Sequence, residues 1–132
     1  MDAREGSDVP DITPELRLQA MALFRQGMKA NSVGVHRTLN RPPRGKGWVP
    51  GHNMPEGVFC RPEKVRESIE WYHKSYAVLP DIVVLNQIAI GHEMLGDTDE
   101  ARAAYVLMKE QAEREQNEVY RRGAEMCLAR LG

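Results

Sequence analysis

The sequence predicts an all-α protein built from antiparallel helical hairpins, and three features support this. Apolar residues recur at helical spacing over most of the 132 residues, as on the buried face of an amphipathic helix. The stretch 81–112 reads as two such helices joined by a short turn at residues 95–98. Prolines and glycines gather in one insertion, residues 40–61, which interrupts the helical pattern.

The central hairpin carries its own start and stop signals. Each helix has one apolar face, formed by Leu85, Ile88, Ala89 and His92 on the first and by Ala101, Tyr105 and Met108 on the second. Gly96 stands where the first helix must stop, because glycine adopts the left-handed backbone common at helix ends. Thr98 is expected to cap the second helix.

Four further helices are predicted from the same signals. Thr13 and Pro14 open the first, which we expect to end at Gln26. Its buried stripe is predicted to hold Leu16, Ala20, Leu23 and Phe24 and to extend just past the helix to Met28. A short helix at 30–39 follows. A helix from Pro62 to Leu79 presents Val65, Ile69, Tyr72 and Tyr76. The last, at about 116–131, presents Val119, Tyr120, Gly123, Met126, Cys127 and Leu131.

Over residues 62–131 this pattern resembles the tetratricopeptide repeat, a helix–turn–helix of about 34 residues. The spacing Leu85-x2-Ile88-Ala89-x2-His92, then Gly96, then Ala101-x3-Tyr105 agrees with the family pattern. Val119-x2-Arg122-Gly123-x2-Met126 resembles the next first helix, and Ser68, Tyr72, Ser75 and Pro80 resemble a preceding second helix. An ordinary helical bundle is the alternative.

The resemblance implies a TPR-like α-solenoid of two to three repeats that binds other proteins and has no catalysis of its own. In such repeats the first helices line the partner-binding groove. The resemblance therefore implies partner-binding residues on the outward side of the first helix of the central hairpin, namely Val83, Asn86, Ile90, Glu93 and Met94. A small accessory or structural subunit of a larger complex fits equally well.

The insertion is basic and carries aromatic residues, which suits a second contact with the partner. Its candidate binding residues are Arg41, Arg44, Lys46, Trp48 and Phe59. Tryptophan and arginine are common anchors of interfaces. Two alternatives stay open: a loop whose Trp48 and Phe59 cover the end of the helices, or a nucleic-acid-binding module in which residues 37–48 stack a base on Trp48.

Composition indicates one domain, residues 13–132, after a flexible tail at 1–12. The net charge of −1 disfavours nucleic acid as the main partner, because such binders are usually basic. No apolar run approaches the ~20 residues that span a bilayer. The only cysteines, Cys60 and Cys127, predict a reducing cytoplasm. We expect Cys60, in a loop, to react faster than Cys127 on a packed helix.

No arrangement of residues predicts an enzyme, a cofactor or a metal site. The four histidines, 36, 52, 73 and 92, occur singly and lack metal-ligand spacing. His52 and Cys60 share the insertion, but a structural zinc ion needs four ligands. Asp97, Asp99 and Glu100 are explained as turn and helix-start residues.

Overall fold

The computed structural model describes residues 12–33, 35–37, 41, 44, 47–51 and 57–132. Predictions for Leu39, Lys46, His52 and the tail at 1–11 lie outside these residues. In chain order the elements are α1 (Pro14–Val33), β1 (Val35–Arg37), β2 (Val49–Pro50), β3 (Val58–Cys60), α2 (Pro62–Val78), α3 (Ile82–Met94), α4 (Thr98–Glu115) and α5 (Glu118–Leu131).

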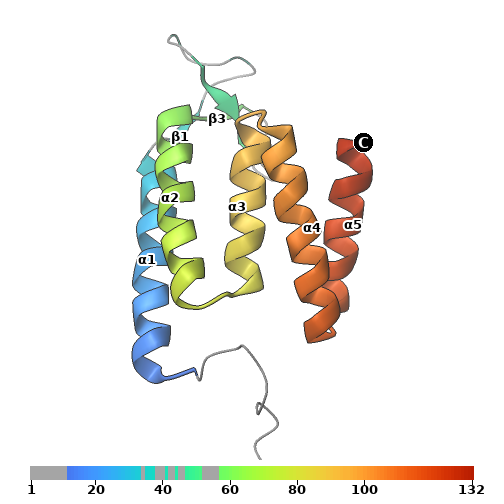
Figure 1. Ribbon diagram of the computed structural model, residues 1–132. Helices are drawn as coiled ribbons and strands as arrows, with labels where there is room; N and C mark the ends of the chain where they lie inside the picture. The colour runs from blue at the N-terminus through green and yellow to red at the C-terminus, as the bar shows by residue number, and fades with distance from the viewer. Residues whose placement is uncertain (1–11, 34, 38–40, 42–43, 45–46, 52–56) are drawn as a thin grey trace, which may run out of the picture.

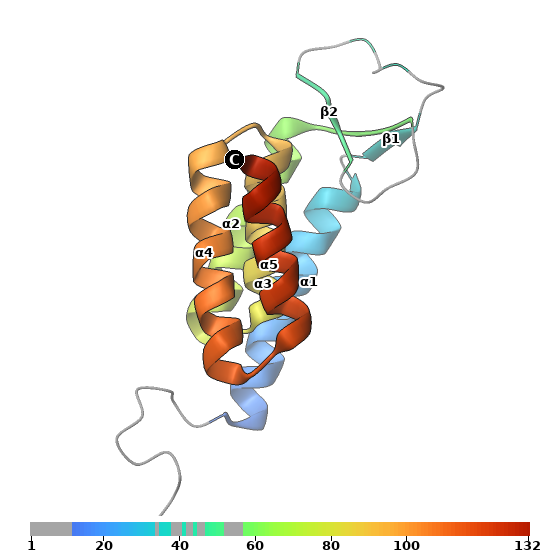
Figure 2. The same cartoon turned by 90° about the vertical axis from the view of Figure 1, so that its right-hand side faces the viewer.

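The described helices form two layers, in which each helix packs antiparallel against the next one in the chain. Helices α2 and α4 lie on one side, and α1, α3 and α5 lie on the other (Figure 1). The view turned by 90° shows the same arrangement (Figure 2). The prediction of a mostly helical fold is confirmed.

The prediction of an all-α protein is wrong in one respect, because the insertion forms part of a small antiparallel sheet of order β1-β3-β2. His36 of β1 and Pro50 of β2 both lie opposite Phe59 of β3. Val58 and Cys60 are buried while Phe59 between them is half-buried, as expected when successive side chains point to opposite faces. The sheet lies at the end of the bundle where α2 begins (Figure 1).

Helix α1 differs from the prediction at its C-terminal end. The backbone N–H of Leu16 donates to Thr13 Oγ1 at 3.1 Å, so the predicted cap is confirmed. Gly27 does not end the helix, which continues to Val33, and the helix predicted at 30–39 is therefore wrong. Gly27 instead allows close packing on α2, since a Cβ built there would lie 2.5 Å from Tyr72 Cε1.

The α3–α4 hairpin is the centre of the core and follows the prediction closely. Its predicted stripes are almost fully buried apart from His92, which is half-buried: Leu85, Ile88, Ala89, Ala101, Tyr105 and Met108. Gly96 has a φ of +78°, in the left-handed region expected of it. Thr98 is the first helical residue and Asp97 is the N-cap, so the predicted cap is wrong by one residue.

Helix α5 packs with only part of the face predicted for it. Ala124 is fully buried, and Tyr120, Cys127 and Leu131 pack against the core as predicted, together with Leu128. Val119 and Met126, predicted to be buried, are 77% and 73% exposed. Since α4 is the principal neighbour of α5, only the side that faces α4 is covered, and the stripe read from the repeat spacing remains open.

Candidate functional site

The outward face of α3 carries the five residues that sequence analysis assigned to a partner-binding groove. Val83 is 39% exposed, and the others are half-buried: Asn86, Ile90, Glu93 and Met94. Asp81 fixes the start of the helix, because its carboxylate accepts a hydrogen bond from the Val83 N–H at 2.9 Å. Because α3 is helical throughout, the spacing of the five residues places them on one face of the helix. Their role in binding stays a prediction.

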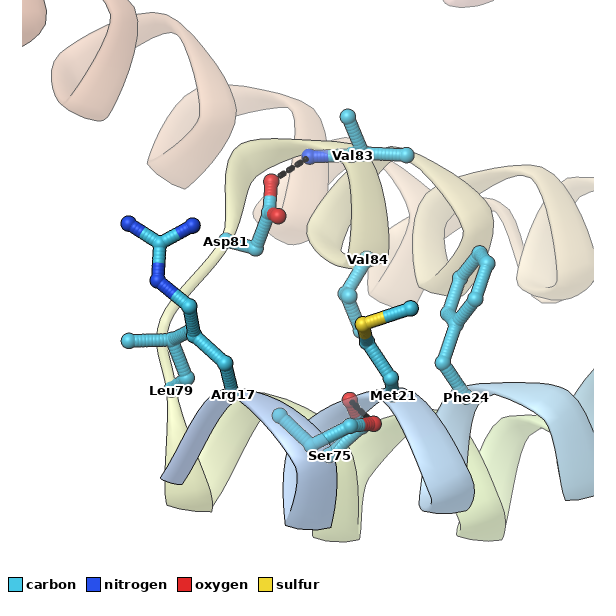
Figure 3. Close-up of a pocket in the computed structure, with 9 residues that line it drawn as sticks. Arg17, Met21, Phe24, Ser75, Leu79, Asp81, Val83 and Val84 are labelled. Carbon is cyan, nitrogen blue, oxygen red and sulfur yellow. Dashed lines mark hydrogen bonds between the residues drawn. The ribbon is translucent and has the colours of Figure 1, made fainter. Parts of the chain in front are cut away.

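A first cavity, the lower cavity, lies between the N-terminal halves of α1 and α3 and has a volume of about 190 Å³. Its walls are mainly apolar and include Met21, Phe24, Val83 and Val84. Figure 3 shows Arg17 on one side of this space and Met21 and Phe24 on the other. Its size and lining suit a single apolar side chain.

A second cavity, the upper cavity, continues along the same two helices with a volume of about 330 Å³. Phe24 lines both cavities, so we treat them together as the α1–α3 groove. The upper cavity also has neutral polar groups in its lining, from Asn31, Tyr72 and Gln87. The Asn31 Oδ1 atom is buried and has no hydrogen-bond partner.

A third cavity, the α3–α5 cavity, has a volume of about 220 Å³. It brings the predicted residues Asn86 and Ile90 of α3 together with Val119 and Gly123 of α5. Nothing lies within 4 Å of a Cβ built on Gly123. The predicted α3 residues therefore border open space on both sides of the helix.

Glu93 is held by its neighbours across three helices. The Tyr105 hydroxyl on α4 donates to Glu93 Oε1 at 2.9 Å, and Arg130 Nη2 on α5 donates to the same atom at 2.9 Å. Arg130 Nη1 donates to Glu93 Oε2. Burial, together with hydrogen bonds to Cys127 and Glu93, raises the pKa of Tyr105. Glu93 therefore ties α3 to α4 and α5.

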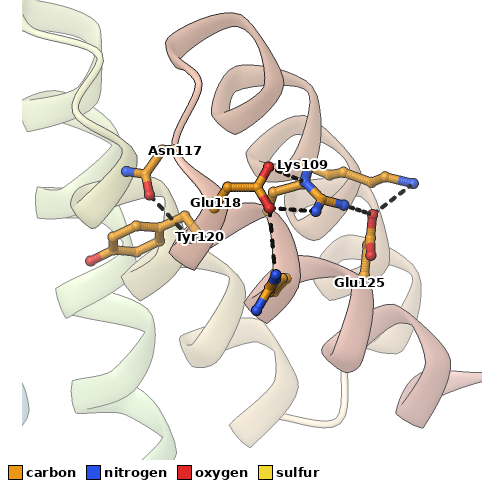
Figure 4. Close-up of polar contacts among 7 residues, drawn as sticks. Lys109, Asn117, Glu118, Tyr120 and Glu125 are labelled. Atoms are coloured by element: carbon orange, nitrogen blue, oxygen red, sulfur yellow. Dashed lines mark hydrogen bonds and ion pairs between the residues drawn. The ribbon is translucent and has the colours of Figure 1, made fainter.

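Figure 4 shows ion pairs along α5, one of which, Lys109–Glu125, joins it to α4. Asn117 Oδ1 accepts from the Tyr120 N–H at 3.2 Å and caps the helix. Glu125 pairs with Arg121 of its own helix at 2.7 Å and with Lys109 of α4 at 3.8 Å. These pairs are partly solvent-exposed and contribute little each. The position of α5 therefore rests mainly on its apolar packing, with Ala124 fully buried.

The insertion places its aromatic residues against its own chain. The Trp48 ring is half-buried, with the His36 ring 5.5 Å away and the Arg61 guanidinium 5.3 Å from its centroid. Phe59 is half-buried, and Arg41 and Arg44 are exposed. The candidate residue Lys46 lies outside the described residues.

The insertion also reaches the face of α3. Pro50 and Gly51 line a cavity of about 260 Å³ together with Glu93 and Met94. The insertion and the outward side of α3 therefore form adjoining surfaces, and one partner can contact both.

The histidines do not form a metal site in the described part of the chain, where no three His, Cys, Asp or Glu residues gather as metal ligands. His92 Nδ1 lies 3.6 Å from Asp97 Oδ2, across the turn between α3 and α4. The His73 and His92 ring centroids are 6.4 Å apart. Burial and the neighbouring His92 lower the pKa of His73.

Comparison of the chain with protein-family models, with curated proteins and with solved structures found no match. None of the helices in the described residues is long and apolar enough to cross a membrane. The evidence for a functional site therefore comes from the geometry of the chain itself.

Sequence analysis missed the α1 side of the groove. Because Gly27 was read as the end of the first helix, Asn31 was assigned to a different element. Met28 was predicted to be buried but is 51% exposed. The available signal was the pair Met21 and Met28, seven residues apart on one helix side and next to the buried stripe.

Proposed function

We propose that this protein is a non-catalytic scaffold that binds another protein. Its main surface is the α1–α3–α5 face, defined by Met21, Met28, Val83, Ile90 and Val119. The observation that carries this proposal is that these apolar side chains line the cavities on three helices, and four of them are 39–77% exposed. Extended apolar surface of this kind marks interaction sites, and methionine adapts to varied partners.

The sizes of the cavities favour a macromolecule over a small substrate. The three volumes on the face are about 190, 330 and 220 Å³, at or below the low end of the roughly 300–1,000 Å³ typical of small-molecule pockets. Two of them follow one another along α1 and α3, and the third lies between α3 and α5, so they do not form one deep site. Separate shallow cavities of this kind suit side chains of a bound polypeptide.

We further propose that the helices form a short tetratricopeptide-like array, with α1–α2 and α3–α4 as hairpins and α5 as the first helix of a following repeat. Packing in chain order supports this, as do the buried small residues Ala89 and Ala101 and the turn at Gly96. A bundle without repeats is the alternative.

The insertion supplies the second contact in this proposal. Its support is the cavity shared by Pro50, Gly51, Glu93 and Met94, which makes the insertion continuous with the α1–α3–α5 face. Arg44 of the same insertion is exposed. We also propose that the protein works in the reducing cytoplasm, since both of its cysteines are free.

A pair of matched valines tests the proposal. Val83 on the face and Val106 on α4 are 39% and 40% exposed. With tagged protein expressed in its native host, Val83→Asp should reduce recovery of the co-purifying partner at least about tenfold, the effect of losing one interface anchor. Val106→Asp should leave recovery at the parental level. Equal recovery with both variants would contradict binding through this face.

Nucleic-acid binding through residues 37–48 is the alternative function. Its support is weaker, because the net charge of the chain is −1, whereas nucleic-acid-binding domains are usually basic. A salt series separates the two, since binding led by phosphate contacts weakens steeply with ionic strength. Binding to a labelled single strand that falls steeply with salt would favour the alternative.

A further inference from the structure

We infer that the α1–α3 groove binds an extended peptide segment, with one apolar side chain in the lower cavity and a backbone amide paired with Asn31 and Gln87 in the upper cavity. This inference rests on the proposed function and specifies the ligand chemistry of one part of the face. It is carried by the neutral polar residues that line the upper cavity, among which the buried Asn31 Oδ1 atom has no hydrogen-bond partner.

The first of these groups is the amide of Asn31. Its Oδ1 atom is buried without a donor, although buried acceptors in folded proteins almost always have one. The side chain as a whole is only partly buried and lines the cavity. Rotation about χ2, which is a soft torsion in asparagine, turns Oδ1 into the cavity and makes it available to a ligand N–H.

Two further groups stand beside it. Tyr72 and Gln87 line the same cavity, and Tyr72 is only 3% exposed. An amide and a phenol each donate and accept hydrogen bonds. A peptide group offers one N–H and one C=O in a fixed plane, so it satisfies this neutral set better than a cation or an anion does.

The dimensions of the groove fit an extended chain. Arg17 and Asn31 mark its two ends on α1, about 21 Å apart at ~1.5 Å per residue. An extended peptide covers that length with about six residues. Phe24 lies between the two cavities, and the lower one, at about 190 Å³ with Met21 and Val84 in its walls, takes one branched apolar side chain of that segment.

Methionine methyl groups report on binding directly. We would label them with ¹³C and titrate the protein with N-acetyl-leucine N-methylamide, a single peptide-like unit with a leucine side chain. The Met21 and Met28 methyl signals should shift with saturation, whereas the Met126 signal on α5 should not. The analogue in which ester oxygens replace both N–H groups, methyl 2-acetoxy-4-methylpentanoate, has no N–H donor and should bind at least about fivefold more weakly.

Variants identify the groups responsible. Asn31→Leu and Gln87→Leu should each weaken binding of the amide probe at least about threefold. Asn31→Leu should also raise the melting temperature of the free protein by about 2 °C or more, because it removes a buried acceptor without a partner. Gln26→Leu, on the opposite side of α1, is the control and should leave probe affinity unchanged.

Three outcomes would overturn the inference: no shift of Met21 and Met28 up to the solubility of the probe, equal affinity for amide and ester, or unchanged affinity in both cavity variants. These results are independent of the proposed function. If the probe fails while Val83→Asp still loses the partner, the face binds protein by other contacts. If the probe binds but Val83→Asp retains the partner, the α1–α3–α5 face is not the main surface.

Discussion

The Tyr105 hydroxyl donates a hydrogen bond to Glu93 Oε1 at 2.9 Å, linking α4 to the helix face that the sequence assigned to partner binding. Arg130 of α5 holds both oxygens of the same carboxylate. Both carboxylate oxygens of Glu93 are therefore already hydrogen-bonded within the protein in the absence of a partner. Among the five assigned residues of α3, it is the one whose substitution should affect stability most through polar contacts.

Replacement of Tyr105 by phenylalanine measures this contact. Glu93 keeps its bonds to Arg130, so Tyr105→Phe should lower the free energy of unfolding by only about 1 kcal/mol at pH 7. Urea denaturation followed by circular dichroism gives this value. A loss of more than about 3 kcal/mol would mean that the hydroxyl supports a larger network than the one described.

The same variant should change how the free energy of unfolding depends on pH above about pH 9. The pKa of Tyr105 is raised in the folded state, whereas an unfolded tyrosine ionises near pH 10. Above that pH the unfolded chain releases a proton that the folded chain retains, so stability falls as pH rises. Tyr72 and Tyr76 add to this fall, because burial raises the pKa of both. Tyr105→Phe should lose less stability than the parent between pH 9 and about 11, and equal losses would contradict the assignment.

Two glycines make opposite predictions for the same substitution. A Cβ at Gly27 would lie 2.5 Å from Tyr72 Cε1 and 3.1 Å from the Ser68 carbonyl oxygen. Gly27→Ala should therefore cost about 1–3 kcal/mol through overpacking. Gly123→Ala, which meets nothing within 4 Å, should stabilise the helix by about 0.5–1 kcal/mol. Urea denaturation of both variants tests the pair, and a stabilised Gly27→Ala variant would disprove the close crossing of α1 and α2.

The sequence predicts the helices from residue 62 onward because each carries both a stripe and a boundary signal. Pro62, Pro80 and Gly96 mark the ends, and the stripes of Leu85 and Tyr105 face the core as expected. The outward residues of α3 follow from the same periodicity. Gly27 misleads because a glycine inside a helix can serve close packing, and only the position of Tyr72 reveals which role it has.

The sheet could not be predicted from periodicity, and the α1 side of the groove was indicated only by the spacing of Met21 and Met28. Strands of two or three residues carry almost no periodic signal, and β1 pairs with β3 across the whole insertion. Gln87 and Asn31 belong to helices whose contact depends on that fold. On α5 the repeat spacing indicated Val119 and Met126, whereas the small residue Ala124 is the one buried. The apolar residues of α5 do not by themselves reveal which side of the helix faces α4.

The cysteines should react in the reverse of the order expected from sequence. Cys60 was assigned to an exposed loop, but it is fully buried in β3, and burial raises the pKa of its thiol. Cys127 is half-buried on α5. Because the thiolate is the reactive form, Cys127 should be labelled first by a thiol reagent in the native protein, and both should react after denaturation. The Cys127→Ser variant is the control, and rapid labelling of that variant would show that β3 is not packed as described.

The last prediction concerns the insertion, where substitutions should weaken partner binding without lowering the stability of the fold. Trp48 contacts His36 and Arg61, and Arg44 is exposed, so neither belongs to the helical core. Trp48→Ala combined with Arg44→Ala should weaken partner binding and leave the helical signal and the melting temperature almost unchanged. Circular dichroism and affinity purification measure the two effects.

Val58→Ala is the matched comparison, because Val58 is a buried residue of the same insertion. It should lower the melting temperature through the cavity it creates while the folded protein still binds. If the double variant instead binds normally and melts several degrees lower, Trp48 serves to cover the end of the helices. The binding site would then be confined to the α1–α3–α5 face around Asn86 and Ile90, because the insertion would add stability without adding contacts.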